Sequence, residues 1–246
     1  MIRRASLISV LLLAAPALAE DVPLPRERPT PPAAAESEDG PAAETEEATE
    51  ADAPAAEAEP DRIYQTQCPM VVRGLVEATL LAPIEDEACR EQTPWEVTAV
   101  KVGGRMVPLS APATLSCEMA GNLPAWAETM DGYLKSTEDT ELAGIVVGTS
   151  YLCRDVNGGE GRLSEHGLAN ALDVVGFELA DGRTVAVEDS WSPAGAAEGR
   201  FLRFSHASAC SIFSTTLGPE ANADHHDHFH IDMGCHGGSC TARLCD

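Results

Sequence analysis

Eight cysteines constrain the fold of this 246-residue chain more than any other feature. None of them lies before position 68. They are Cys68, Cys89, Cys117, Cys153, Cys210, Cys235, Cys240 and Cys245. An even number of cysteines indicates disulfides in an exported chain, and the leader described below predicts export. The sequence alone does not select one pairing. We expect neighbours to pair: Cys68 with Cys89, Cys117 with Cys153, and the last four among themselves.

A metal site is the alternative use of the late cysteines. Cys235, Cys240 and Cys245 lie near His236, and both thiolate sulfur and imidazole nitrogen bind zinc. Thiols are oxidised outside the reducing cytosol, however, so disulfides are the stronger expectation. We therefore predict a disulfide-stapled domain.

The start of the chain has the pattern of a cleavable secretory signal. Arg3 and Arg4 precede a largely apolar run over residues 7–18, and an Ala-Leu-Ala triplet ends at position 19. The run is shorter than the about 20 residues that a membrane-spanning helix needs. We expect residues 1–19 to be a signal peptide and the mature protein to be periplasmic, without a membrane span. A buried N-terminal helix is the alternative.

A strongly acidic segment follows. Residues 20–60 hold 13 acidic and 2 basic residues, with 8 prolines, 11 alanines and no aromatic residue. This composition cannot bury enough apolar surface to offset the conformational entropy lost on folding. We expect residues 20–61 to be a disordered acidic linker rich in proline and alanine. Residues 62–246 then form one folded domain.

The overall charge argues against two classes of partner. The chain has 16 Lys and Arg against 40 Asp and Glu, a formal net charge of −24. Nucleic acids and anionic lipids are bound by clustered basic side chains. We therefore expect no nucleic-acid partner and no docking on anionic lipid. The sequence leaves the oligomeric state open.

Turn residues and apolar periodicity predict the elements of the domain. Hairpins are expected around Gly103-Gly104 and Asp181-Gly182. They would pair residues 97–102 with 105–109, and residues 173–179 with 184–187. Helices are expected over 117–134, where Pro124 can kink the helix or delay its start, and over 199–217; strands are expected over 144–152 and 228–233. Hairpins with separate helices indicate an α+β fold, with helices packed on a small antiparallel sheet.

Histidines cluster near the end of the domain, where residues 228–232 read His-Phe-His-Ile-Asp. Side chains two apart on a strand share a face, so His228, His230 and Asp232 would lie together while Phe229 and Ile231 enter the core. Two imidazoles on one face are at chelating distance, and imidazole is a common zinc ligand.

A second group of candidate ligands lies upstream. His166 and Asp173, together with one histidine of the late strand, would make a site with three protein ligands and a fourth position for water, as in catalytic zinc centres. A helix-cap contact or a surface pair is the alternative role of His166 and Asp173. We expect His225 to be a solvated loop residue, whereas the role of His226 stays open.

Over about residues 115–235 the chain resembles the bacterial extensin-like C-terminal domain family. The stretches that carry the resemblance are residues 150–154 (SYLCR), 163–166 (LSEH), 171–174 (ALDV), 179–183 (LADGR), 209–210 (AC), 217–219 (LGP) and 228–232 (HFHID). That family is similar to the LAS-type zinc peptidases, which act on D-Ala-D-Ala and on peptidoglycan cross-links. The resemblance implies a fold of that type.

The resemblance also implies roles for individual residues. His166, Asp173 and His230 match the zinc ligands, and His228 matches a proposed base or transition-state stabiliser. Arg154 resembles an arginine that binds a substrate carboxylate or the developing oxyanion, although it could equally pair with a surface carboxylate.

One departure from the family pattern concerns Asp227, which stands where carboxypeptidase-type members have a catalytic Glu. Asp227 is one methylene shorter than Glu, and strand alternation places it on the face opposite His228 and His230 unless a bulge turns it. We therefore favour His228 over Asp227 as the general base.

The function expected from these features is a zinc-dependent hydrolase of amide bonds in peptidoglycan peptides, of endopeptidase or carboxypeptidase type. The alternative is a non-catalytic cell-envelope module that binds peptidoglycan peptides or metal on the same fold.

Overall fold

The structure is a computed structural model that describes residues 67–86, 88–157 and 159–246. The predicted signal peptide, residues 1–19, and the predicted acidic linker, residues 20–61, lie outside the described residues. No helix within the described ranges is both long enough and apolar enough to cross a membrane.

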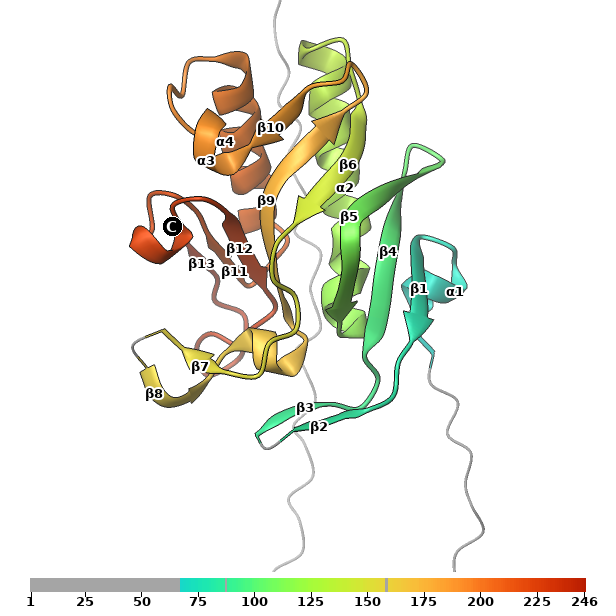
Figure 1. Cartoon of the computed structure of the whole chain (residues 1–246), viewed down its shortest axis with the longest axis vertical. Coiled ribbons are helices and arrows are strands. Elements are labelled where there is room, and N and C mark those ends of the chain that lie inside the picture. The colour runs from blue at the N-terminus through green and yellow to red at the C-terminus, as the bar shows by residue number, and fades with distance from the viewer. Residues whose placement is uncertain (1–66, 87, 158) are drawn as a thin grey trace, which may run out of the picture. The chain divides into compact units, whose positions relative to one another are not determined.

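A mixed sheet of nine strands forms the centre of the domain, in the order β1-β4-β5-β6-β9-β12-β11-β13 with β10 added beside β9 (Figure 1). Its strands are β1 (Val76–Leu80), β4 (Trp95–Val102), β5 (Arg105–Leu115), β6 (Leu142–Val147), β9 (Ala171–Leu179), β10 (Thr184–Ala186), β11 (Thr215–Leu217), β12 (Phe229–Asp232) and β13 (Leu244–Cys245). Two short hairpins stand apart from it, β2 (Ile84–Asp86) with β3 (Cys89–Glu91) and β7 (Asp155–Val156) with β8 (Gly159–Leu163).

This sheet confirms the α+β class and corrects the expectation of a small antiparallel sheet. The pairs β5–β6 and β11–β13 are parallel. The chain leaves β5 and crosses over through a long helix before it returns as β6, and a crossover of this kind allows parallel pairing. The sheet is larger than expected because it also includes very short strands such as β11 and β13. These strands have too few residues to show a periodic pattern in the sequence.

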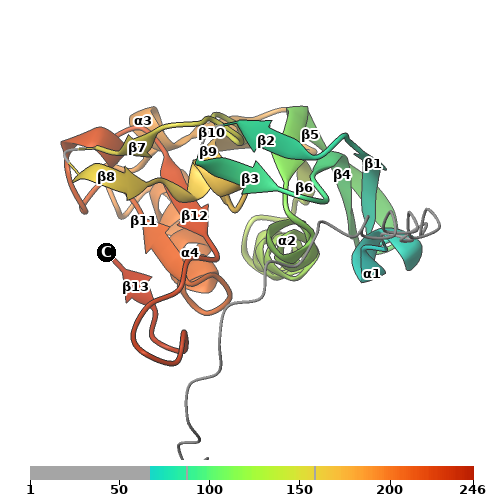
Figure 2. The same cartoon turned by 90° about the horizontal axis from the view of Figure 1, so that it is seen from below.

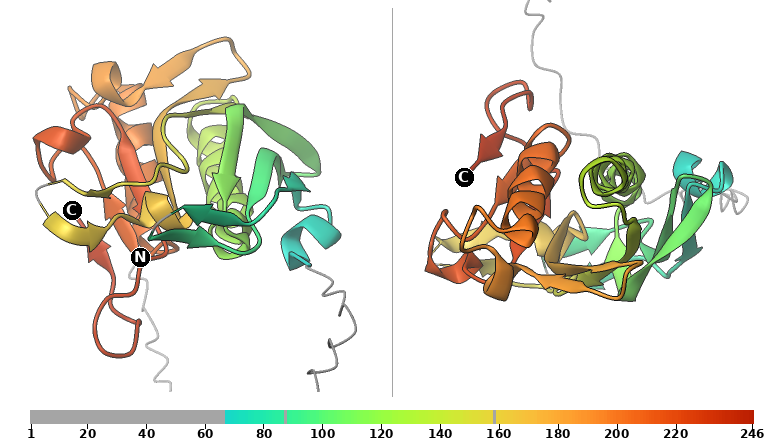
Figure 3. Two further views of the ribbon diagram at one scale, coloured as in Figure 1. Left: turned by 60° about the horizontal axis from the view of Figure 1, so that its bottom comes forward. Right: turned by 90° about the horizontal axis from the view of Figure 1, so that it is seen from above.

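The helical segments of the described chain are α1 (Pro69–Val72), α2 (Cys117–Thr137), η1 (Glu165–Leu168), α3 (Val187–Ser190), α4 (Ala197–Cys210) and η2 (Ala223–His225). Figures 2 and 3 show α2 and α4 on the same face of the sheet. The core lies between them and the sheet, where Trp126 of α2 packs edge-on against Phe177 of β9 and against Phe213, each at a centroid distance of 5.8 Å.

Local predictions were correct where the turn chemistry is strong. The β4–β5 hairpin turns at Gly103 and Gly104, whose φ angles of 55° and 88° favour glycine. The β9–β10 hairpin turns through Gly182 at φ 90°. Helix α2 begins at Cys117 and runs through Pro124, so the proline does not delay the start of the helix.

Two predicted elements extend too far. The helix expected over 199–217 ends at Cys210, and its last residues form β11, which pairs with β12 and β13. The strand expected over 144–152 ends at Val147, after which the chain leaves the sheet. Both errors have one cause. An apolar run in the sequence does not show at which residue the backbone hydrogen bonds of its helix or strand end.

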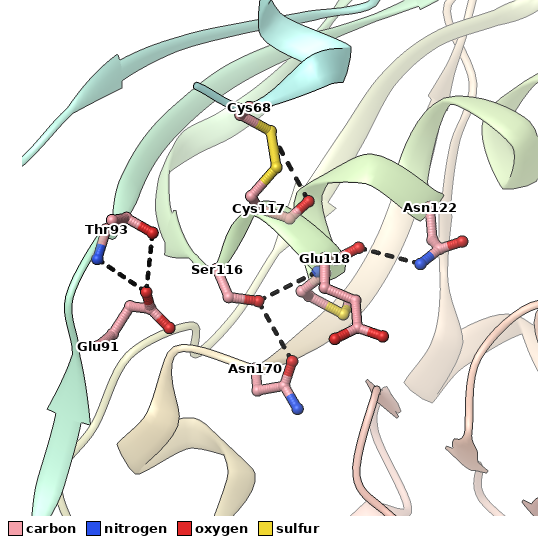
Figure 4. Close-up of a disulfide and its surroundings, with 9 residues drawn as sticks. Cys68, Glu91, Thr93, Ser116, Cys117, Glu118, Asn122 and Asn170 are labelled. Atoms are coloured by element: carbon pink, nitrogen blue, oxygen red, sulfur yellow. Dashed lines mark hydrogen bonds between the residues drawn. A yellow bond between two sulfur atoms is a disulfide. The ribbon is translucent and has the colours of Figure 1, made fainter. Parts of the chain in front are cut away.

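Four disulfides staple the domain: Cys68–Cys117, Cys89–Cys153, Cys210–Cys245 and Cys235–Cys240. The predicted pairing of the last four cysteines among themselves is confirmed, but the predicted Cys68–Cys89 and Cys117–Cys153 pairs are wrong. The fold places Cys68, which precedes α1, beside Cys117 at the start of α2 (Figure 4). It places Cys89 of β3 beside Cys153 in the segment after β6. Cys235, Cys240 and Cys245 are oxidised, which excludes the cysteine metal site.

The start of α2 is also tied to the segment that holds two candidate ligands. Ser116 caps the helix by accepting a hydrogen bond from the Met119 amide, and its hydroxyl donates to Asn170 Oδ1 over 3.2 Å (Figure 4). Asn170 Nδ2 in turn donates to Glu165 Oε2 over 2.7 Å. Asn170 lies between η1 and β9. The Cys68–Cys117 disulfide supports this connection because Cys117 directly follows Ser116, which bonds to Asn170.

Candidate metal centre

Three side chains converge at the point where β9, β12 and η1 meet. Asp173 on β9 and His230 on β12 are directly opposite in the antiparallel register. His166 on η1 lies beside both of them, and its side chain is only 1% exposed. Cross-strand neighbours have the close Cβ spacing that lets two side chains share a ligand. We call His166, Asp173 and His230 the ligand triad.

The donor atoms of the ligand triad have the spacing of a tetrahedral zinc site. His166 Nε2 lies 3.2 Å from His230 Nδ1 and 3.3 Å from Asp173 Oδ1, and His230 Nδ1 lies 3.1 Å from Asp173 Oδ1. Zinc bonds of about 2.0–2.1 Å in a tetrahedron place neighbouring ligand atoms about 3.3 Å apart. Two imidazoles and one carboxylate are also a donor set that zinc accepts. These residues therefore fit a zinc ion.

Hydrogen bonds outside the ligand triad orient both imidazoles. His166 Nδ1 lies 2.6 Å from the Ser150 carbonyl oxygen, which can only accept, so the proton of this ring is on Nδ1 and Nε2 faces the triad. His230 Nε2 lies 2.9 Å from Asp232 Oδ2, which leaves Nδ1 for the triad. Such partners behind ligating histidines are typical of metal sites.

Charge balance in the triad supports the same geometry. Burial raises the pKa of the Asp173 carboxyl, but the neighbouring imidazoles of His166 and His230 outweigh this effect and hold that pKa far below its usual value. Burial lowers the pKa of His230, whereas hydrogen bonds to Asp173 and Asp232 outweigh this effect and raise the pKa to about 9. In the metal-free protein a proton on His230 thus supplies the positive charge that a cation would otherwise provide.

His228 and Asp227 form a pair beside the triad. His228 Nε2 lies 3.5 Å from Asp173 Oδ1, and its Nδ1 lies 2.8 Å from Asp227 Oδ1. This bond holds the pKa of Asp227 below its usual value. Asp227 therefore contacts His228 and does not itself contact the triad, and both residues precede the first residue of β12. Asp227 can orient His228, whose Nε2 faces the site.

Arg154, the candidate substrate-binding arginine, does not contact the triad within the described residues. Its guanidinium donates to the Asp155 carbonyl over 3.0 Å and to Asn157 Oδ1 over 3.2 Å. Asn157 Nδ2 in turn donates to Asp224 Oδ2 over 3.1 Å, which joins the β7–β8 hairpin to η2. To reach a substrate, the arginine would have to exchange these partners.

A cleft of about 420 Å³ opens beside His230 and Asp232. The cleft is lined by the β7–β8 hairpin with Arg154 and Arg162, by the segment around His225 and by the C-terminal loop, and of the ligand triad His230 alone lines it. The volume suits a few residues of a peptide.

His225 is the residue that sequence reasoning missed, because it lines this cleft and is half-buried. Its ring centroid lies 5.2 Å from that of His228 and 5.7 Å from that of His230. Nδ1 bonds to Asn222 Oδ1 over 2.8 Å, which leaves Nε2 with a free lone pair, and burial lowers its pKa. The asparagine three residues earlier is the sequence signal, because it caps η2 and fixes the ring. His226 is exposed and bonds to the Ala223 carbonyl.

A second group of potential ligands, His206 with Cys210 and Cys245, is not a metal site because its cysteines form a disulfide. The ligand triad is thus the remaining candidate among the residues that the structure describes.

The family described as extensin-like protein C-terminus matches residues 62–245. The chain belongs to this family. The match spans the whole described domain, including all elements that carry the triad. No curated protein and no solved structure matches the chain. The extensin-like resemblance expected from the sequence is confirmed, and the ligand triad, His228 and His225 all lie inside the extensin-like domain.

Proposed function

We propose that this extensin-like domain is an exported zinc-dependent hydrolase of amide bonds in peptidoglycan peptides, of endopeptidase or carboxypeptidase type. The observation that carries the proposal is the set of donor atoms 3.1–3.3 Å apart, one of whose residues, His230, lines a cleft of peptide size. The similarity of the His166, Asp173 and His230 pattern to that of LAS-type zinc peptidases supports the choice of metal and substrate. A peptidase-like fold is part of this proposal.

The residues divide the chemistry as follows. When bound, zinc supplies a Lewis acid that lowers the pKa of water to about 7 and polarises a carbonyl group. His228 accepts a proton at Nε2, because Asp227 keeps its other nitrogen protonated. The Asp227 carboxylate then stabilises the imidazolium. Arg154 binds a substrate carboxylate or the developing oxyanion once it leaves Asn157.

The cellular address belongs to the same proposal. Peptidoglycan lies outside the cytoplasmic membrane, and four disulfides suit an oxidising compartment. The basic and apolar leader supports export to the periplasm.

The test is a digest of purified sacculi and cross-linked muropeptides by the zinc-loaded protein, followed by mass spectrometry of the products. We expect amide cleavage by the wild type and its loss in His166→Ala and His228→Ala. His226→Ala is the matched control, because His226 belongs to the same segment but is exposed and bonds to Ala223. Intact substrates after incubation with folded, zinc-loaded wild type would overturn the proposal.

A non-catalytic module is the second candidate. In its favour, the members of the ligand triad satisfy one another's hydrogen bonds, so the site is stable as a polar cluster without turnover. This candidate predicts that muropeptides bind the folded protein uncleaved, and that His228→Ala binds them as the wild type does.

A further inference from the structure

A chain of polar side chains extends from the back of His230, away from the ligand triad. His230 Nε2 lies 2.9 Å from Asp232 Oδ2. Thr215 faces Asp232 in the β11–β12 register, and its hydroxyl helps to hold the pKa of the Asp232 carboxyl below its usual value. Thr215 Oγ1 lies 2.7 Å from His236 Nε2. Asp232 and Thr215 are 5% and 4% exposed, so water does not compete freely for these bonds.

The chemistry of the groups sets the direction of every bond in this chain. A carboxylate only accepts, so His230 Nε2 donates to Asp232, and the Thr215 hydroxyl can act toward this carboxylate only as a donor. The Thr215 proton is then committed, and its oxygen must accept from His236 Nε2–H. The Gly234 amide also donates to Asp232 Oδ1, over 2.8 Å. All donors therefore point toward one buried carboxylate.

This polarity acts on the metal-facing side of His230. An ionised Asp232 keeps the imidazole proton on Nε2, which leaves the Nδ1 lone pair for a metal, and it fixes the ring plane. Thr215 and Gly234 hold the carboxylate in place. His236 holds the Thr215 hydroxyl with its proton toward Asp232, because it occupies the lone pair on the other side.

The position of His236 is fixed by a loop that a disulfide closes. His236 lies inside the short loop that the Cys235–Cys240 disulfide closes, and it forms an isolated antiparallel bridge with Ala242. β13 then pairs in parallel with β11, the strand that carries Thr215. The sequence separates His236 from His166 by 70 positions, and only the fold connects them.

We propose that Asp232, Thr215 and His236 are positioning residues that set the metal affinity of the ligand triad through His230. This inference rests on the proposed function, because it requires a metal at the triad. None of these residues contacts the metal in this scheme, and because all three line the cleft, the metal affinity is measured without substrate. They act through the tautomer and orientation of one imidazole.

The experiment measures the zinc dissociation constant of the mature protein by competition with a chromogenic chelator, without substrate. We expect Thr215→Val and His236→Ala each to weaken zinc binding about 10-fold, the lower end of such effects. His236→Gln is the matched control, because its side-chain amide can donate where Nε2–H did, and Thr215→Ser keeps the hydroxyl. Both controls should bind zinc like the wild type. The double variant should be no weaker than Thr215→Val alone, since His236 acts through Thr215.

Each alternative outcome has a distinct meaning. Unchanged zinc affinity in Thr215→Val and His236→Ala overturns the positioning role while the proposed function stands, even if thermal unfolding of these variants with a chelator shows lower stability. Additive losses in the double variant overturn the connection through Thr215. Failure of the wild type to bind zinc stoichiometrically overturns both this inference and the proposed function.

Discussion

At the scale of single residues, four histidines near the site are each oriented by a different partner of one ring nitrogen. The four partners are a backbone carbonyl, a buried carboxylate, an exposed carboxylate and an amide oxygen, and each orients one imidazole. These are His166 with Ser150, His230 with Asp232, His228 with Asp227, and His225 with Asn222. The sequence showed which histidines cluster, and it offered Asp232 either as a residue that orients an imidazole or as the end of the strand. It did not show Ser150 as the partner of His166, because that contact joins residues 16 positions apart.

Asp227 offers a residue-scale test of the proposed mechanism. Removal of its carboxylate in Asp227→Ala should lower turnover about 10- to 100-fold, because His228 loses both its orientation and the charge that stabilises its protonated form. The zinc dissociation constant should not change, since Asp227 bonds only to His228 beside the site. Parallel turnover and chelator measurements check this. A large fall in zinc affinity would show that Asp227 supports the triad instead.

The pH dependence of the metal-free protein is a second test at this scale. Asp173 and Asp232 have lowered pKa values, so their contribution to stability is present above about pH 4 and is lost as pH falls. His230 has a pKa raised to about 9, so its contribution is complete below about pH 6.5 and is lost as pH rises to about 9. Thermal unfolding with a chelator should show this alkaline loss. His230→Gln should remove it, and His226→Ala should keep it.

At the scale of elements, the hairpins were predictable because turn residues act locally. Glycine at positive φ and an Asp-Gly pair specify a turn whatever surrounds them. Strands β11 and β13 were not predictable, since they have three and two residues and exist only through their partners. The disulfide partners of Cys68 and Cys89 were not predictable either. In the structure these cysteines pair with partners 49 and 64 positions away.

Disulfide removal should separate long loops from short ones. Cys68→Ser with Cys117→Ser opens a loop with a sequence separation of 49, whereas Cys235→Ser with Cys240→Ser opens one of 5. Loop-closure entropy predicts losses of about 4 and about 2 kcal/mol in the free energy of unfolding. Urea denaturation of both double variants measures the difference. Equal losses would mean that local strain or packing outweighs chain entropy.

At the scale of the whole domain, the ligand triad joins elements that are distant in sequence. His166 comes from η1, Asp173 from β9 and His230 from β12. A metal bound by all of them stabilises the folded state and not the unfolded chain, in which no such site exists. Metal binding is therefore linked to the stability of the domain.

Zinc addition tests this linkage directly. At a free concentration one hundred times the dissociation constant, zinc should add about 2.7 kcal/mol to the free energy of unfolding. For a domain of this size the unfolding midpoint should rise by about 5–10 °C. Magnesium, which prefers oxygen ligands, should give no such shift. His166→Ala should lose the zinc effect and His226→Ala should keep it, as calorimetry can measure. An equal shift in both variants would place the zinc outside the ligand triad.

Sequence alone was enough for the features that depend on neighbours within a few positions. These are the glycine turns, the presence of helix α2, the alternation that buries Phe229 and Ile231, and the presence of disulfides in an α+β domain. Tertiary structure alone decided the disulfide partners, the mixed sheet, the place of His225 in the cleft and the polar chain from His230 to His236. The physical reason is distance along the chain: hydrogen-bonding partners, burial and disulfide geometry are set by segments that meet only after folding.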